Sequence, residues 1–142
     1  MYNWGVFKKM VMENSFMKDA LSVHICDDRT ELGCQSAKAV YHRINELFKT
    51  KEEINLLFAA APSQNEFLEA LTAYKDIPWQ RINAFHMDEY IGLDDNAPQR
   101  FGNFLKERIF GFFPIKSVNY IEGNSKELEQ ECQRYGAWFD KG

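Results

Sequence analysis

The sequence lacks the features that would assign it at once to a membrane, nucleic-acid-binding or disulfide-rich class. No apolar run approaches the roughly 18 residues that a transmembrane helix needs. No run of Lys or Arg forms a basic patch, and the formal net charge of −4 argues against nucleic acid as the main partner. The three cysteines, Cys26, Cys34 and Cys132, follow no metal-ligand spacing, and their odd number does not suit a disulfide framework.

These absences favour a reduced cytoplasmic protein with no contact with a membrane. The first twenty residues carry five charged side chains and no small-residue cleavage site, so they do not match a signal peptide. A length of 142 residues, with 45% hydrophobic and 27% charged residues, suits one globular core without internal repeats or linkers. We therefore expect a single domain over residues 1–142, in which residues 1–19 form an amphipathic helix or a docking arm.

From residue 20 onward the apolar pattern alternates between strand and helix periods four times. The expected strands are residues 21–26, 54–61, 81–87 and 117–121, and the expected helices are residues 28–49, 63–74, 98–109 and 124–139. Helix starts at Asp28 and Ser63 each have a glutamate three residues later, which is the capping-box pattern. Alternating strands and helices predict an α/β fold, a three-layer Rossmann-like arrangement with a mostly parallel sheet flanked by helices.

The most informative segment is RINAFHMDEYIGL, residues 81–93. Strand side chains alternate, so His86 and Asp88 fall on the same face where an apolar strand ends. Ligands of open α/β sheets bind at the carboxyl ends of the strands. Partial burial there would raise the pKa of Asp88 toward that of a general base, and His86 would bond to Asp88 or contact a ligand. The alternative is a turn-capping Asp88, a solvated Glu89 and a hydrogen-bonded core histidine.

A second candidate region is the turn that follows the strand at residues 54–61. Ser63 and Gln64 precede a helix whose first amides and dipole can bind phosphate at the same sheet edge as Asp88. The alternative is that Ser63 is only an N-cap paired with Glu66. The turn also lacks the glycines that let a backbone wrap closely around phosphate.

Two arginines lie on the helix that follows the Asp88 loop. For Arg100, in its first turn, both an anionic ligand and simple solvation of the helix stay open, whereas Arg108 is expected to solvate the helix. His24, His42 and the cysteines are assigned to packing or the surface. We therefore predict neither a metal site nor a bound cofactor.

At this point a resemblance becomes visible. The segments FHMDEYIGL, NFLKERIF and VNYIEGN together resemble the glucosamine-6-phosphate deaminase/isomerase family, which is related to the 6-phosphogluconolactonases. The match is collinear from Leu21 to Phe139. It implies that Asp88 carries the proton in aldose–ketose isomerisation, taking it from C2 of the open-chain amino sugar and helping to return one at C1 through an enolamine. Ammonia is then lost and fructose 6-phosphate forms.

The resemblance also implies a small sugar phosphate as substrate. With the candidates above, the predicted substrate-binding residues are Ser63, Gln64, His86, Glu89 and Tyr90. Family members typically carry a Gly-Gly-Thr phosphate loop where this chain has Ala61, Pro62 and Ser63. Ser63 can replace the threonine hydroxyl, but Pro62 removes an amide donor.

A further departure concerns length. The family's ring-opening and phosphate-clamping residues lie in segments later than Phe139, so the chain is expected to be a truncated first half with weak or no activity. Its sheet would then have an uncovered edge or helix face, which favours a homo-oligomer or another covering partner. Two other functions stay open. One is a lactonase-like hydrolase, against which Tyr90 argues because lactonases tend to carry arginine there. The other is a non-catalytic sugar-phosphate-binding module.

Overall fold

The computed structural model describes residues 15–139, so most of the helix or arm expected at residues 1–19 lies outside the described part. The part of that segment that is described, residues 15–19, contains a strand rather than a helix. This strand, β1 (Ser15–Lys18), pairs antiparallel with β2 (Leu21–His24). The strand expected at residues 21–26 is therefore present, but the prediction that it joins the parallel sheet is wrong. Closing a two-residue turn onto β1 costs less chain entropy than a long crossover does.

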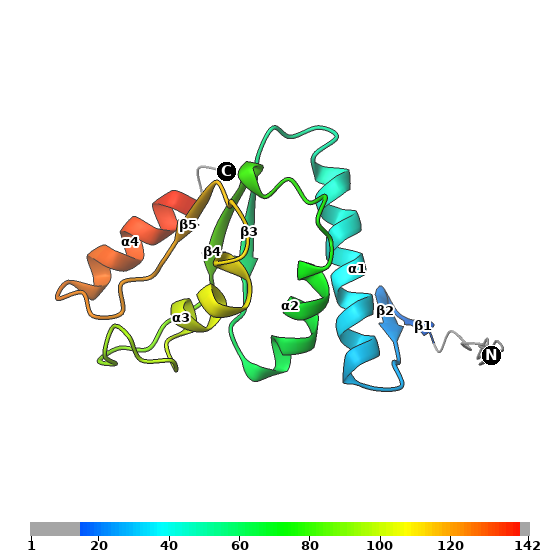
Figure 1. Cartoon of the computed structure of the whole chain (residues 1–142), viewed down its shortest axis with the longest axis horizontal. Coiled ribbons are helices and arrows are strands. Elements are labelled where there is room, and N and C mark those ends of the chain that lie inside the picture. Colours follow the sequence, from blue (N-terminus) through cyan, green and yellow to red (C-terminus); the bar gives the residue numbers. More distant parts are fainter. Residues whose placement is uncertain (1–14, 140–142) are drawn as a thin grey trace, which may run out of the picture.

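The main sheet is parallel and has three strands. In spatial order these are β3 (Ile54–Phe58), β4 (Ile82–His86) and β5 (Ser117–Asn119). The register places Phe58 opposite His86 and Phe85 opposite Asn119, so all three strands end at one edge, the lower edge of the sheet in Figure 1. Within residues 15–139, β3 and β5 are edge strands with β4 between them.

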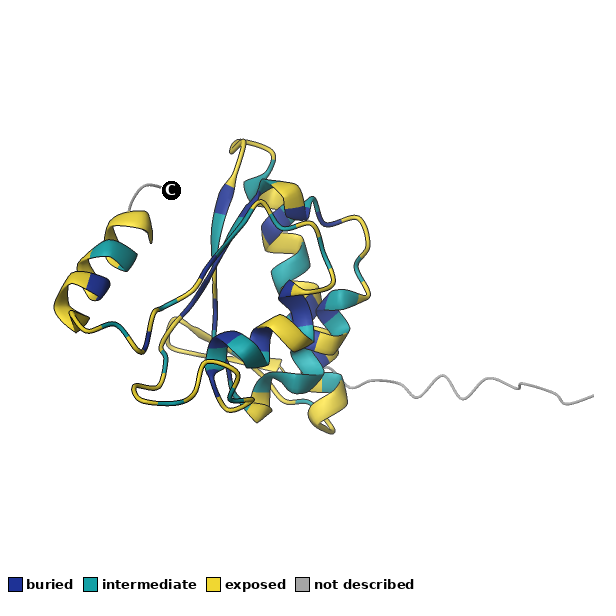
Figure 2. Ribbon diagram, turned by 60° about the vertical axis from the view of Figure 1, so that its left-hand side comes forward, coloured by how far each residue is buried: buried dark blue, intermediate teal, exposed yellow. Residues whose placement is uncertain are grey.

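Helices cover both faces of this sheet, which confirms the predicted α/β class. They are α1 (Arg29–Leu47), α2 (Asn65–Thr72), α3 (Phe101–Leu105) and α4 (Leu128–Phe139). Figure 2 shows α4 on one side of the sheet and the other three helices on the opposite side. After α3 the chain continues through a π-helical turn (Lys106–Phe110), in which the Gly111 amide donates to the Lys106 carbonyl at 2.9 Å.

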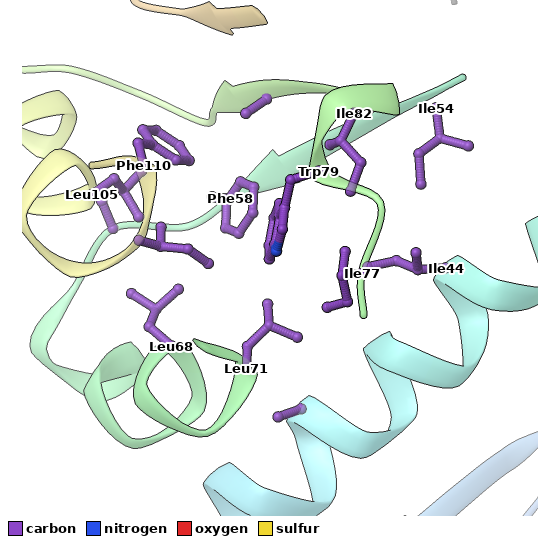
Figure 3. Close-up of a cluster of buried hydrophobic side chains, with 14 residues drawn as sticks. Ile44, Ile54, Phe58, Leu68, Leu71, Ile77, Trp79, Ile82, Leu105 and Phe110 are labelled. Atoms are coloured by element: carbon purple, nitrogen blue, oxygen red, sulfur yellow. The ribbon is translucent and has the colours of Figure 1, made fainter. Parts of the chain in front are cut away.

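The hydrophobic core lies between the sheet and the α1–α3 layer (Figure 3). Strand residues that alternate along β3 and β4 supply one wall, and the helices and the segment before β4 supply the other. The largest fully buried core side chains are Trp79, Ile44, Leu68, Leu71, Ile82, Leu105 and Ile109. Removing this apolar surface from water is the main force that holds the layers together.

The two predicted capping boxes have different outcomes. Asp28 is the N-cap of α1, and its side chain accepts a hydrogen bond from the Glu31 amide at 2.8 Å, as expected. Ser63 is not the cap of α2. It lies in a 3₁₀ turn (Pro62–Gln64) ahead of the helix, and the N-cap position falls on Gln64, which makes no side-chain cap bond. The glutamate that a capping box at Ser63 would need binds Arg29 instead, and α2 begins at Asn65.

Glu66 instead links α2 to α1. Its two carboxylate oxygens accept from Nε and Nη2 of Arg29, each at 2.8 Å. Beside this pair the helices touch at Gly33, where a Cβ atom would lie 2.6 Å from the carbonyl carbon of Glu66. A glycine is therefore needed at this contact.

The second face of the sheet is more polar than expected for strands buried on both sides. Asn55, Asn83 and Ser117 lie opposite one another across the three strands. Asn83 donates to Asn55 at 3.1 Å, and Ser117 donates to Asn83 at 2.8 Å. A parallel strand covered by helices on both faces is usually apolar on both, and β3 departs from this on the side that carries Asn55. Next to this polar ladder, Phe85 packs against Tyr135 and Phe139 of α4.

Candidate active site at the carboxyl edge of the sheet

The two regions singled out in the sequence leave the sheet at the same edge. The Met87 amide donates to the Phe58 carbonyl at 3.1 Å, so the ladder between β3 and β4 continues one residue beyond β4. From there one chain segment runs to Asp88, and the other runs to the turn that holds Ser63 and Gln64 (Figure 1). This is the position at which parallel sheets bind ligands.

Asp88 and its neighbour Tyr90 are exposed side chains at this edge. The partial burial expected of Asp88 is absent, because the carboxylate projects beyond the last paired residue. Tyr90 is 51% exposed, and its ring lies 4.7 Å from that of Phe101. Both side chains are therefore open to a ligand from solvent.

His86, in contrast, is fully buried, and both of its ring nitrogens are occupied. Nε2 lies 3.0 Å from the Ile121 amide, and Nδ1 lies 2.8 Å from the Asp88 carbonyl oxygen. An amide can only donate and a carbonyl can only accept, so the ring must be neutral with its proton on Nδ1. Neither ring nitrogen is left free for a ligand, because the ring bonds to the Ile121 amide and to the backbone, not the carboxylate, of Asp88.

Burial lowers the pKa of His86, in agreement with the neutral ring. The hydrogen bond to Asp88 and the charges of Asp88 and Glu89 oppose that shift, and the nearby Arg100 reinforces it. The backbone of His86 is held as well. The Tyr135 hydroxyl accepts from the His86 amide and donates to the His86 carbonyl, each at 2.8 Å. Helix α4 therefore contacts the end of β4 directly.

Glu89 is a structural residue that the sequence pattern did not reveal. Only 2% of its side chain is exposed. Its carboxylate accepts hydrogen bonds from the Phe101 amide at 2.9 Å and the Gly102 amide at 3.0 Å, which are free donors at the start of α3. The Tyr90 amide donates to the same carboxylate at 2.9 Å. The expectation of a solvated or substrate-binding Glu89 is therefore replaced by a helix cap.

Arg100 is buried among three carboxylates and is not free to meet an anion. Its guanidinium lies 2.5 Å from Asp95, 3.8 Å from Glu89 and 3.9 Å from Glu122. The nearby Asn124 donates to the Leu93 carbonyl and to Asp95, each at 2.8 Å. The loop that follows Asp88 is thereby tied down at several points.

The turn before α2 differs from a glycine-rich phosphate loop, as the sequence indicated. Ser63 is exposed and Gln64 is half-buried. Arg108 donates from Nε to the Asn65 side chain at 2.8 Å, while its guanidinium stacks over Phe104 at 3.9 Å. The expectation that Arg108 only solvates its helix is wrong, because this contact brings a cation to the first residue of α2.

Among residues 15–139, no group of three or more His, Cys, Asp or Glu side chains is placed to hold a metal ion. In the same part of the chain, no helix is long and apolar enough to cross a membrane.

Comparison with known proteins gives consistent relatives. No family model matches the chain. The chain is 33% identical over 112 residues to a glucosamine-6-phosphate deaminase of Aliivibrio salmonicida. The aligned region covers 74% of this chain and 42% of the relative. A glucosamine-6-phosphate deaminase of Borreliella burgdorferi is 33% identical over 106 residues, with 70% and 40% covered. The chain thus spans less than half the length of the curated relatives it matches.

Solved structures agree with this result. A monomeric glucosamine-6-phosphate deaminase of the NagB superfamily superposes with a TM-score of 0.69 at 25% identity, covering 82% of this chain and 48% of that protein. A 6-phosphogluconolactonase from Shewanella baltica gives a TM-score of 0.66 at 13% identity, with 80% and 48% covered. The second likeness concerns the fold alone.

Proposed function

The chain belongs to the glucosamine-6-phosphate deaminase superfamily, which is related to the 6-phosphogluconolactonases, and from this relationship we propose that it acts on an amino-sugar phosphate. The reaction is the isomerisation of glucosamine 6-phosphate with loss of ammonia. The observation that carries the proposal is Asp88, an exposed carboxylate whose own backbone is fixed by a buried histidine at the carboxyl edge of the sheet.

In this proposal Asp88 works as a general base on the open-chain sugar. Its carboxylate takes the proton from C2, and the electron pair of that bond forms a C1–C2 double bond. At the same time the π pair of the C1 carbonyl moves to O1, which takes up a proton, and an enolamine results. Return of a proton to C1 converts the enolamine into an imine at C2. Water adds to this imine, ammonia leaves, and fructose 6-phosphate remains. Tyr90, exposed beside Asp88, would contact the sugar.

The phosphate would bind at the turn before α2. Ser63 offers a hydroxyl and lies in the turn directly before α2, where the helix dipole favours an anion, while the Gln64 amide already donates to the Ala61 carbonyl at 2.8 Å. Pro62 has no amide to offer, so phosphate affinity is expected to be lower than a glycine-rich loop would give. Two of the described cations lie at this turn: Arg108 donates to the Asn65 side chain at 2.8 Å, and Arg29 donates to the Pro62 carbonyl at 3.1 Å.

Exchange of the C2 proton of glucosamine 6-phosphate in D₂O, followed by NMR, tests Asp88 directly. Asp88→Asn should lower the exchange rate by about a hundredfold or more, because general base catalysis commonly supplies 10²–10⁴. Asp94→Asn is the matched control in the same loop, since Asp94 is also exposed, and it should retain the rate within a few fold. Normal exchange in Asp88→Asn would disprove the assignment of the base.

A binding module without catalysis is the second candidate, favoured by Pro62, which leaves the turn before α2 one amide donor short. Saturable binding of glucosamine 6-phosphate with no C2 exchange would select it. Release of acid from 6-phosphogluconolactone, without ammonia from the amino sugar, would select the lactonase reaction instead.

A further inference from the structure

We propose that His86 is a positioning residue whose ring clamps the carbonyl of Asp88 to the end of β5, and so fixes where the Asp88 carboxylate points. The ring hydrogen bonds to the Asp88 carbonyl and the Ile121 amide are called the His86 clip. The clip holds together the segments that follow β4 and β5 at the carboxyl edge of the sheet. Its catalytic consequence rests on the proposed function, in which Asp88 is the base, whereas its geometry does not.

The clip works in one protonation state only. The Asp88 carbonyl requires a proton on Nδ1, and the Ile121 amide requires a bare Nε2. A second proton would place an Nε2–H against the Ile121 N–H, and two donors cannot bond to each other. Protonation of the ring must therefore open the arm to β5 and release that end of the clip.

Charged and titratable groups surround the ring from every side. Asp88 and Glu89 belong to the loop after β4, and Arg100 comes from the start of α3. The Tyr120 ring, after β5, lies 5.9 Å away, and the Tyr135 ring of α4 lies 6.1 Å away. The acidic pair favours the cation, while Arg100 and burial favour the neutral ring. Because burial is the largest of these influences, the neutral ring and the closed clip prevail at neutral pH.

Tyr135 completes the arrangement from the opposite side of the sheet. Its hydroxyl bonds to both the amide and the carbonyl of His86. The histidine therefore cannot shift along β4 without breaking contacts to α4. This rigid support is what allows hydrogen bonds at a ring to determine the direction of a neighbouring side chain.

Ring ¹⁵N NMR on the whole chain tests the clip without any variant. At about pH 7.5, well above the ordinary histidine pKa, Nδ1 should show the shift of a protonated nitrogen and Nε2 that of an unprotonated one. A proton on Nε2, or an imidazolium at this pH, would overturn the clip.

Two variants separate its two arms. His86→Asn places an amide N–H where Nδ1 lies and keeps the donor to Asp88, but it leaves the Ile121 amide unbonded. His86→Gln places an oxygen where Nε2 lies and keeps the acceptor for Ile121, but it loses the Asp88 arm. The carbonyl ¹³C shift of Asp88 should stay close to that of wild type in the first variant and change in the second. The reverse result would overturn the proposal.

Catalysis should follow the Asp88 arm. We expect His86→Asn to keep C2 exchange within about threefold, and His86→Gln to lose about tenfold or more, because small displacements of a reacting group are costly. Equal losses in both variants would mean that His86 serves only the folding of the chain. His24→Asn, in the exposed hairpin, is the matched control.

The two proposals fail in different ways. If wild type shows no C2 exchange, the proposed function fails, and the clip is then judged on the ring ¹⁵N and Asp88 ¹³C shifts alone. If exchange is present and depends on Asp88, but the ring carries its proton on Nε2, the function stands and the clip fails.

Discussion

The Glu89 carboxylate accepts hydrogen bonds from the Tyr90, Phe101 and Gly102 amides while its side chain is almost completely buried. Glu89→Gln keeps the shape of the side chain but replaces one acceptor oxygen with a donor that faces an amide N–H. We expect the free energy of unfolding to fall by about 1–2 kcal/mol, the usual effect of losing a helix cap. Urea denaturation followed by circular dichroism measures the change.

The control for that experiment is Glu107→Gln on the helical extension of α3. The Glu107 side chain is 67% exposed, so its substitution should change the free energy of unfolding by less than about 0.5 kcal/mol. Equal effects of the two substitutions would mean that Glu89 does not cap α3.

Residues whose partners are close in the chain could be predicted, and those with distant partners could not. The Asp28 cap follows from a pattern three residues long. The hydrogen bonds that Glu89 accepts from Phe101 and Gly102 span 12 and 13 residues, so no local pattern reveals them. The period-two rule placed His86 and Asp88 on one face of β4 and left a core histidine open, but the ring bond of His86 to Ile121 depends on β5 lying beside β4.

At the level of elements, two helical glycines offer a matched pair. Gly33 sits where α1 touches α2, and a Cβ there would lie 2.6–2.8 Å from three atoms of Glu66, two of them backbone. At Gly136 in α4, an added Cβ would meet nothing within 4 Å. Gly33→Ala should lower the free energy of unfolding by about 1–3 kcal/mol through overpacking. Gly136→Ala should raise it by up to about 1 kcal/mol through helix propensity. Thermal unfolding of both variants measures the effect. A change of the melting temperature in the same direction for both would contradict this packing.

The attachment of α4 to the sheet gives a second prediction at this level. Tyr135→Phe removes the hydroxyl that serves both the amide and the carbonyl of His86, and leaves a buried N–H without its partner. The expected cost is about 1–3 kcal/mol. Tyr120→Phe is the control, since that ring also lies beside His86 but the residue is 40% exposed. Urea denaturation of both variants measures the change in the free energy of unfolding. Equal changes would mean that Tyr135 does not anchor α4.

Strand positions were predictable because side-chain periodicity is local, whereas strand pairing was not. The alternation from Leu21 to Cys26 correctly indicated a strand, yet β2 pairs with β1 rather than with the parallel sheet. The start of α2 was misplaced for a related reason. The spacing of Ser63 and Glu66 fits a capping box, but Arg29 of another helix takes the glutamate.

For the whole molecule, the layered α/β arrangement followed from the alternation of strand and helix patterns, and the structure has it. What covers the open sheet edges could not be read from these residues, because the chain spans 42% of one deaminase relative and 40% of another. Sedimentation velocity over a range of concentrations tests the predicted self-association. A monomer at every concentration would show that the exposed edges alone do not drive it.

Acid should destabilise the whole molecule in two stages. The pKa of His86 is lowered from 6.5 by burial, and that of Glu131 is lowered from 4.5 by its hydrogen bond from Arg134. In both cases the unfolded chain takes up protons at a higher pH than the folded chain does. The contribution of these two groups to stability is therefore complete above pH 6.5, falls as pH drops from 6.5 through the lowered His86 pKa, and falls again below pH 4.5.

His86→Asn separates the two stages. The variant cannot titrate at residue 86, so its free energy of unfolding should stay flat where that of wild type first declines, and should then decline with wild type below pH 4.5. Urea denaturation at a series of pH values measures both slopes. A variant that loses stability in parallel with wild type through the upper window would place the first stage on another group. A flat wild-type profile there would mean that His86 keeps its ordinary affinity for protons, which a ring held between a carbonyl and an amide cannot do.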